Sequence, residues 1–232
     1  EGAEIDFGNE ACARMGANCE WVTQDWDGII PALLNGKYDI IIAGMSITEE
    51  RKEKVNFTNG YMNDGARFWV LKDSGLANLS VAGINKVNMN KAGGKEQAAI
   101  GQLIAVMGGK TVCVQSSTTH ANFVEQYMAG AVDIRLYQTV DDHNIDLSAG
   151  RCDAVLSDVA SALDFMDTDQ GSNAAFTGPT FSGGPWGDGV GGAIRKEDTD
   201  ILEMWNKAIA EMSADGTTAN ITEKWFGRDM SM

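Results

Sequence analysis

The chain has 232 residues, with 18 Lys and Arg against 33 Asp and Glu, which gives a formal net charge of −15. With 44% apolar and 22% charged residues, the composition is that of a globular protein and excludes an intrinsically disordered one. The acidic balance argues against a nucleic-acid partner, because phosphate backbones are bound through Lys and Arg, and it favours a cationic small molecule.

The N-terminal segment predicts a helix that leads into a strand. Residues 1–10 lack the basic start and apolar stretch of a secretory signal, so the chain is either cytosolic or already processed. Apolar residues between Ile5 and Met15 have helical spacing, Gly16 follows as a stop signal, and residues 19–22 are typical of a strand start. This geometry brings Cys12 and Cys19 within bridging distance, which would indicate an oxidising compartment. Two separate buried thiols are the alternative.

Strand-like and helix-like segments alternate along the rest of the chain. Strands are predicted over residues 38–43, 66–72, 110–115, 133–137, 153–157 and 193–195, and helices over residues 26–36, 97–107, 120–128, 141–149, 158–166, 201–212 and 219–226. This order favours an α/β protein with parallel, doubly wound sheets. The apolar run 38–43 is typical of a parallel strand covered on both faces. Cys113 and Cys152 both lie in strand-like runs, and whether they pair stays open.

Polar side chains follow three of these strands. Ser46 or Thr48 can cap a short helix that carries Arg51, whose guanidinium could hold a carboxylate. Residues 116–120 form a run of hydroxyls that ends in a histidine, and Asp158 ends another strand. Plain helix capping is the alternative function at each of these positions.

Trp26 is either a core residue or a flat surface for a cation or an alkyl chain. Together with Arg51, the hydroxyl run and Asp158, it makes up a set suited to the carboxylate and ammonium of an amino acid.

Ordered motifs across essentially the whole chain resemble the family 3 periplasmic solute-binding proteins that serve ABC importers of polar amino acids. The resemblance is strongest to the lysine/arginine/ornithine, histidine and opine binders. It rests on Ser46-Ile47-Thr48-x-x-Arg51 with Val55-x-Phe57-Thr58, the run 116–120, Gly150 to Asp158, and Ala214-Asp-Gly216 before Lys224-Trp-Phe-Gly227. It implies the type II fold of periplasmic binding proteins, with two doubly wound lobes joined by a two-strand hinge. Lobe 1 is expected over residues 1–72 and 187–232, and lobe 2 over residues 73–186.

The resemblance also implies roles for individual residues. Arg51 holds the ligand α-carboxylate, Asp158 accepts the α-ammonium, and Trp26 packs on the ligand side chain. The remaining positions carried over are Gly44, Ser46, Thr118 and Thr119 around the carboxylate, and Cys12 with Cys19 as a disulfide.

The sequence departs from the family pattern at its beginning. Against the family pattern, a stretch of lobe 1 is expected to be missing at the Ala3/Glu4 junction, along with the preceding N-terminal strand, which would leave Glu1 to meet the distal cationic group of a ligand. Residues 75–95 are an insertion relative to the histidine-type binders.

The resemblance predicts the substrate-binding component of an ABC importer for arginine, lysine, ornithine, histidine or a related opine. It is expected to be a periplasmic monomer that works with permease subunits, binds no nucleic acid, metal or cofactor, and catalyses no reaction. A dehydratase-type enzyme on the same fold is an alternative, with Glu1 and Asp158 as its acid candidates. A sensory ligand-binding domain is another.

Overall fold

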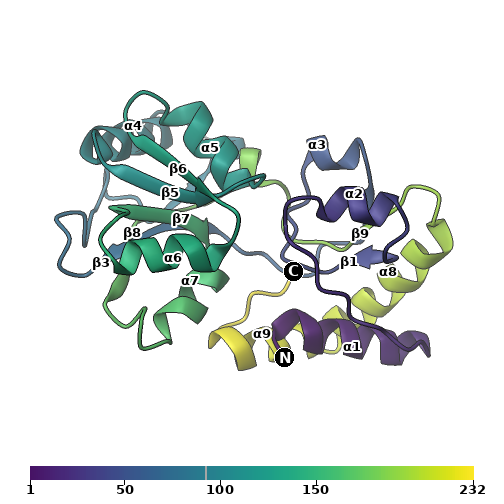
Figure 1. The fold of residues 1–232 in the computed structure, drawn as a ribbon. Helices are drawn as coiled ribbons and strands as arrows, with labels where there is room; N and C mark the ends of the chain where they lie inside the picture. Colours follow the sequence, from purple (N-terminus) through teal and green to yellow (C-terminus); the bar gives the residue numbers. More distant parts are fainter. Residues whose placement is uncertain (92) are drawn as a thin grey trace. The chain divides into compact units, whose positions relative to one another are not determined.

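The computed structural model describes residues 1–91 and 93–232 and divides them into two compact units (Figure 1). Unit 1 comprises Glu1–Asp64 and Gly187–Met232, and unit 2 comprises Gly65–Trp186. The first boundary therefore precedes the one expected after residue 72, because the strand that begins at Ala66 belongs to the sheet of unit 2. Residue 92, which falls within the expected insertion 75–95, lies outside the described residues. Among the helices described, none combines the length and apolar character needed to cross a membrane.

Unit 2 is built on a mixed sheet. Its described strands follow the order β4-β8-β3-β7-β5-β6. Their bounds are β3 Ala66–Leu71, β4 Lys86–Asn88, β5 Thr111–Gln115, β6 Asp133–Tyr137, β7 Ala154–Asp158 and β8 Ala174–Ser182. β5 runs parallel to β6 and β7, whereas β3 pairs antiparallel with β7 and β8. The parallel part carries the predicted βαβ order, and the carboxyl ends of β5 and β7 meet at one edge of the sheet.

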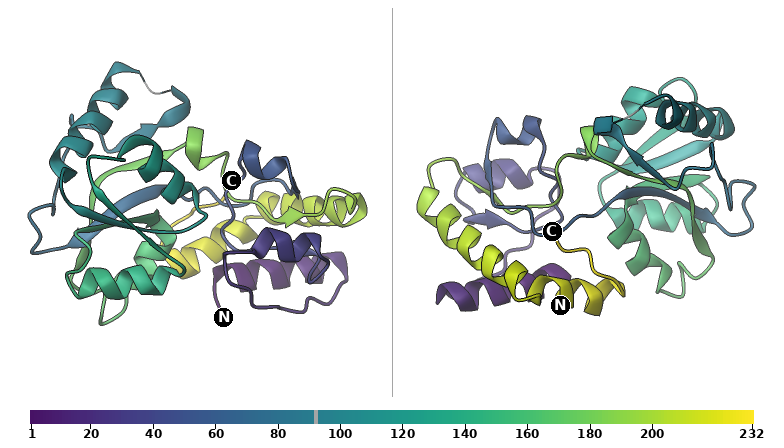
Figure 2. Two further views of the ribbon diagram at one scale, coloured as in Figure 1. Left: turned by 45° about the horizontal axis from the view of Figure 1, so that its top comes forward. Right: turned by 180° about the vertical axis from the view of Figure 1, so that it is seen from behind.

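Helices cover both faces of this sheet (Figure 2). α4 (Gly94–Met107) and α5 (Thr119–Tyr127) lie on one face, and α6 (Val140–Ser148) and α7 (Val159–Met166) lie on the other. The alternation of side chains along a strand divides the core accordingly. In β3, for example, Phe68 and Val70 pack under α4 and α5, whereas Trp69 packs toward α6 and α7. Two short 3-10 turns, η1 (Met89–Lys91) and η2 (Gly184–Trp186), complete the unit.

Unit 1 holds a small antiparallel sheet and two groups of helices. β9 (Ala193–Ile194) lies between β1 (Ile40–Ile41) and β2 (Asn56–Phe57) and pairs antiparallel with both. α2 (Ile29–Leu34) packs on β1, and α3 (Glu49–Lys52) follows in the chain. The run 38–43 therefore forms a two-residue antiparallel strand, not the parallel strand expected from its apolar pattern.

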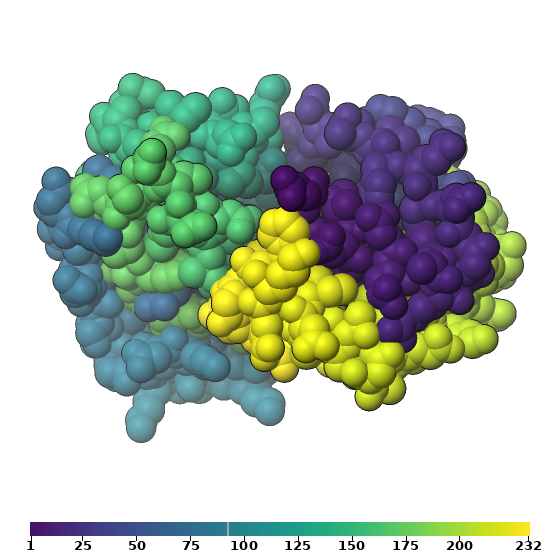
Figure 3. All heavy atoms as spheres, turned by 90° about the horizontal axis from the view of Figure 1, so that it is seen from below, coloured from purple at the N-terminus to yellow at the C-terminus, as the bar shows by residue number. Residues whose placement is uncertain are grey.

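The N-terminal helix of unit 1 packs on the two C-terminal helices. α1 (Ala3–Met15) contacts α8 (Thr199–Ala214) and α9 (Thr217–Phe226), as the purple and yellow surfaces in Figure 3 show. Gly16 ends α1 in the left-handed conformation (φ 68°), as its position after the helical pattern predicts. α1 begins at Ala3, so the Ala3/Glu4 junction lies in its first turn, and the stretch expected to be missing there stays a prediction.

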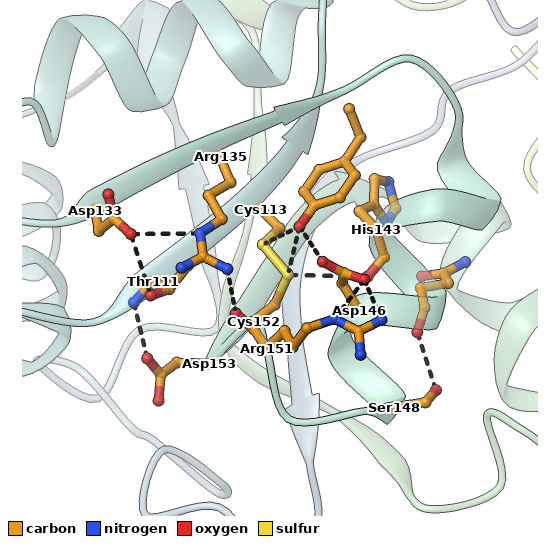
Figure 4. The surroundings of a disulfide bond; sticks show 12 residues. Thr111, Cys113, Asp133, Arg135, His143, Asp146, Ser148, Arg151, Cys152 and Asp153 are labelled. Carbon is orange, nitrogen blue, oxygen red and sulfur yellow. Dashed lines mark hydrogen bonds and ion pairs between the residues drawn. A yellow bond between two sulfur atoms is a disulfide. The ribbon is translucent and has the colours of Figure 1, made fainter.

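All four cysteines are paired. Cys12 bonds to Cys19 in unit 1, and Cys113 bonds to Cys152 in unit 2, which answers the question that the sequence left open. The second disulfide joins β5 to the residue two positions before β7 and lies buried (Figure 4). Tyr137 Oη lies 3.8 and 3.7 Å from its two sulfur atoms and donates a 2.6 Å hydrogen bond to Asp146. Hydrogen bonds from Arg151 and then from Tyr137 lower the pKa of Asp146 below its ordinary value.

Two segments differ from the sequence predictions. Residues 19–22 form no strand, and they line a cavity of about 310 Å³ beside β1, with Trp21 and Val22 exposed. β8, which pairs with β3 along most of its length, has no counterpart among the predicted strands.

Candidate functional site

In unit 1, Arg51 is held by its neighbours. The hydroxyl of Thr48 caps α3 by accepting a hydrogen bond from the Arg51 N–H, at 3.3 Å. The guanidinium donates to the Ser46 carbonyl at 2.9 Å and lies 5.4 Å from the centre of the Trp26 ring. Arg51, Ser46 and Trp26, all expected ligand residues, are thus brought together within this unit. Trp26 also packs on the core around Ile29, and its contact with a ligand stays a prediction.

The Gly44 amide, another expected ligand contact, is engaged by an acidic side chain. Glu4 Oε1 accepts a 2.8 Å hydrogen bond from the Gly44 N–H and a short one from the Tyr61 hydroxyl. Burial and the neighbouring Glu4 carboxylate raise the pKa of Tyr61 well above its ordinary value, so the phenol stays protonated and donates. The Gly44 N–H, which was expected to bind the ligand carboxylate, therefore donates to the Glu4 carboxylate in this structure.

In unit 2, Asp158 ends β7 and lies directly before α7. Its side chain makes no capping hydrogen bond to that helix, so the capping alternative does not describe it. Its carboxylate instead pairs with His120 of α5, with Oδ1 3.3 Å from Nε2. The Asp158 side chain is one-third exposed, whereas that of His120 is 4% exposed, so the pair has one accessible and one buried member.

Thr118 and Thr119 begin α5 at the same edge of the sheet. The Thr118 hydroxyl accepts from the Ala121 N–H at 3.1 Å and donates to the Gln115 carbonyl at 2.7 Å, so it acts as a helix cap. The capping alternative therefore holds for this hydroxyl. The first N–H groups of a helix have no partner within it, and those of α5 remain candidates for a carboxylate.

His120 and Trp186 form a further part of this site that the sequence patterns do not predict. The two rings lie 5.2 Å apart, centre to centre, and both side chains are buried. The histidine follows the hydroxyl run directly, which was the available signal, but nothing local indicates its contact with Asp158.

The remaining expectations concern Glu1 and metal binding. Glu1 is exposed ahead of α1, and its contact with a ligand stays a prediction. Within residues 1–91 and 93–232, no three His, Cys, Asp or Glu side chains gather as a possible metal-ligand set.

The family model of the bacterial extracellular solute-binding proteins, family 3, matches residues 1–228. The chain belongs to this family. Its curated relatives include the octopine-binding periplasmic protein of Rhizobium meliloti, which is 34% identical over all of this chain and 84% of the relative. The L-arginine-binding protein of Pseudomonas aeruginosa is 35% identical over 99% of this chain and 80% of the relative.

The solved structures of this solute-binding family share its fold. An ancestral arginine-binding protein bound to arginine superposes with a TM-score of 0.79 at 33% identity, covering 97% of this chain and 88% of that one. These relatives confirm the predicted family and its type II fold. All three are named as binding proteins, and the octopine binder is named as periplasmic.

Proposed function

We propose that this family 3 solute-binding protein is the periplasmic substrate-binding component of an ABC importer, and that it binds a cationic amino acid or a related opine. One observation carries the proposal. The cationic Arg51 in unit 1 and the anionic Asp158 in unit 2 have the charges that complement the carboxylate and the ammonium of a zwitterion. Relatives that bind octopine and arginine support this ligand class, as does the formal net charge of −15.

Each residue has a chemical role in this proposal. Arg51 binds the ligand α-carboxylate through its planar guanidinium, with amides near Ser46 and Thr119 as further donors. Asp158 accepts from the α-ammonium, and Trp26 packs on the ligand side chain beside the guanidinium that it already contacts. The two units correspond to the two expected lobes and would close around the ligand. The ligand shifts the equilibrium between the open and closed states because it binds the closed state more tightly.

On this proposal, the protein is a monomer that binds its ligand and does not catalyse a reaction. The names of its relatives support binding, and acid catalysis would need a carboxyl group with a raised pKa at the reacting centre. The two acid candidates do not suit that task, because Glu1 is exposed and Asp158 is paired with His120.

Isothermal titration calorimetry tests the proposal. L-arginine, L-lysine, L-ornithine, L-histidine and octopine are titrated into the protein, with L-leucine as the negative control. Arg51→Ala should weaken the binding of the preferred ligand by about two to three orders of magnitude, about 3–4 kcal/mol, because the ligand carboxylate loses its charged partner. Arg228→Ala, which removes an exposed arginine near the C-terminus, serves as the matched control and should bind like the wild type. Unchanged affinity in Arg51→Ala, or no binding of any of the five ligands, would refute the proposal.

A further inference from the structure

His120 combines burial with two ring nitrogens that make no hydrogen bond. The residue is 3% exposed, and neither Nδ1 nor Nε2 has a hydrogen-bond partner. Nε2 is nonetheless only 3.3 Å from Asp158 Oδ1, so a small rotation of the carboxylate would complete the bond. A buried polar group without a partner destabilises the folded protein, and a site that retains one usually has a use for it.

The surroundings of His120 hold its ring in one place. Thr118 fixes the start of α5 two residues earlier, and the Trp186 ring lies at 5.2 Å with an interplanar angle of 49°. Asp158 is held less firmly, because its side chain does not cap α7 and is one-third exposed. The histidine is thus the fixed member of the pair and the carboxylate is the adjustable one.

We propose that His120 is a positioning residue for ligand binding: its neutral imidazole carries the proton on Nε2, donates to Asp158 Oδ1 and leaves Oδ2 for the ligand ammonium. This inference rests on the proposed function of Asp158. A protonated His120 would place a second cation on the same carboxylate and would repel the ligand ammonium. The neutral tautomer that donates from Nε2 is therefore the form of His120 that this role requires.

The first experiment needs no ligand. A ¹H–¹⁵N spectrum of the histidine side chains at pH 8 distinguishes a protonated from an unprotonated Nε2. We expect the proton of His120 on Nε2 and a changed Nε2 resonance in Asp158→Asn. A proton on Nδ1, or a resonance that Asp158→Asn leaves in place, would overturn the assignment.

The second experiment measures arginine binding by calorimetry at pH 8. His120→Leu should bind about tenfold more weakly, whereas His120→Gln, whose amide can still donate, should stay within about threefold of the wild type. Equal binding by His120→Leu and the wild type, or a loss in His120→Gln as large as that in His120→Leu, would refute the role of His120 alone. If the wild type binds none of the amino acids or octopine, the proposed function fails, and the spectrum still decides the bond between His120 and Asp158.

Discussion

Removal of the two disulfides should destabilise the two units by different amounts. The Cys113–Cys152 bond closes a loop with a sequence separation of 39, and the Cys12–Cys19 bond closes one of 7. In the chain-entropy model, a cross-link stabilises by restricting the unfolded chain, and the effect grows with the logarithm of the loop length. At 25 °C the model gives about 3.9 kcal/mol for the long loop and about 2.4 kcal/mol for the short one. The double variant C113A/C152A should therefore lose about 1.5 kcal/mol more than C12A/C19A.

Hydrogen exchange with urea titration measures this difference unit by unit. Such a readout is needed because two units need not unfold as one. C113A/C152A should lower the protection of β5 and β7, and C12A/C19A should lower that of α1. Each variant removes one pair of sulfur atoms and serves as the control for the other, although Cys19 is only half-buried whereas Cys12, Cys113 and Cys152 are buried. Equal losses, or a larger loss for the short loop, would show that loop entropy does not govern the two bonds.

Two further predictions concern a buried histidine and a partly buried arginine. The pKa of His143 is about 4 in the folded unit, because the residue is buried, and ordinarily about 6.5 in an unfolded chain. Between these two pH values the unfolded state binds more protons than the folded state. The free energy of unfolding should therefore fall by about 3 kcal/mol as the pH drops from 6.5 to 4. Urea titrations across that interval should show no such loss in His143→Leu, and an unchanged loss would contradict the assignment. Arg195 donates to two carbonyl groups and pairs with two carboxylates although its side chain is only 14% exposed, so Arg195→Met should destabilise unit 1 by about 3 kcal/mol in thermal or urea unfolding. Arg228→Met is the control, and equal stability of the two variants would refute a structural role for Arg195.

The elements that the sequence predicts well depend on local signals. α1 combines helical spacing of its apolar residues with a glycine directly after its last turn. β6 spans residues 133–137 as predicted, because an extended run lies between two turn-forming segments. The helices of unit 2 begin and end within a few residues of their predicted bounds for the same reason.

The elements that the sequence does not predict depend on contacts between distant segments. β8 contains Gly178 in the left-handed conformation, followed by Pro179, and both residues weaken a strand pattern. It is a strand because β3 pairs with it over a hundred residues away. Conversely, Cys19–Val22 has the composition of a strand, but no strand pairs with it in the described structure.

The candidate site also contains contacts that local sequence signals predict and contacts between distant segments that they do not predict. Arg51 and its cap at Thr48 can be predicted, because three residues separate the capping hydroxyl from the N–H that it binds. The contact between His120 and Asp158 cannot, because it depends on how α5 packs beside the end of β7. Helix capping was an equally good prediction for Thr118 and Asp158, and it holds only for the threonine.

On the proposed function, the two charged groups differ in how firmly each is held within its own unit. Arg51 is oriented by Ser46 and Trp26 before a ligand arrives, whereas the Asp158 carboxylate lies beside His120 and can still rotate. Ordering a long side chain costs about 0.5–1.5 kcal/mol when it must happen on binding, and prepared groups avoid that cost. The ligand then has to supply only the difference in free energy between the open and closed arrangements. A zwitterion supplies it through both of its charges, whereas a simple amine or carboxylate would satisfy one unit and leave the other unpaired.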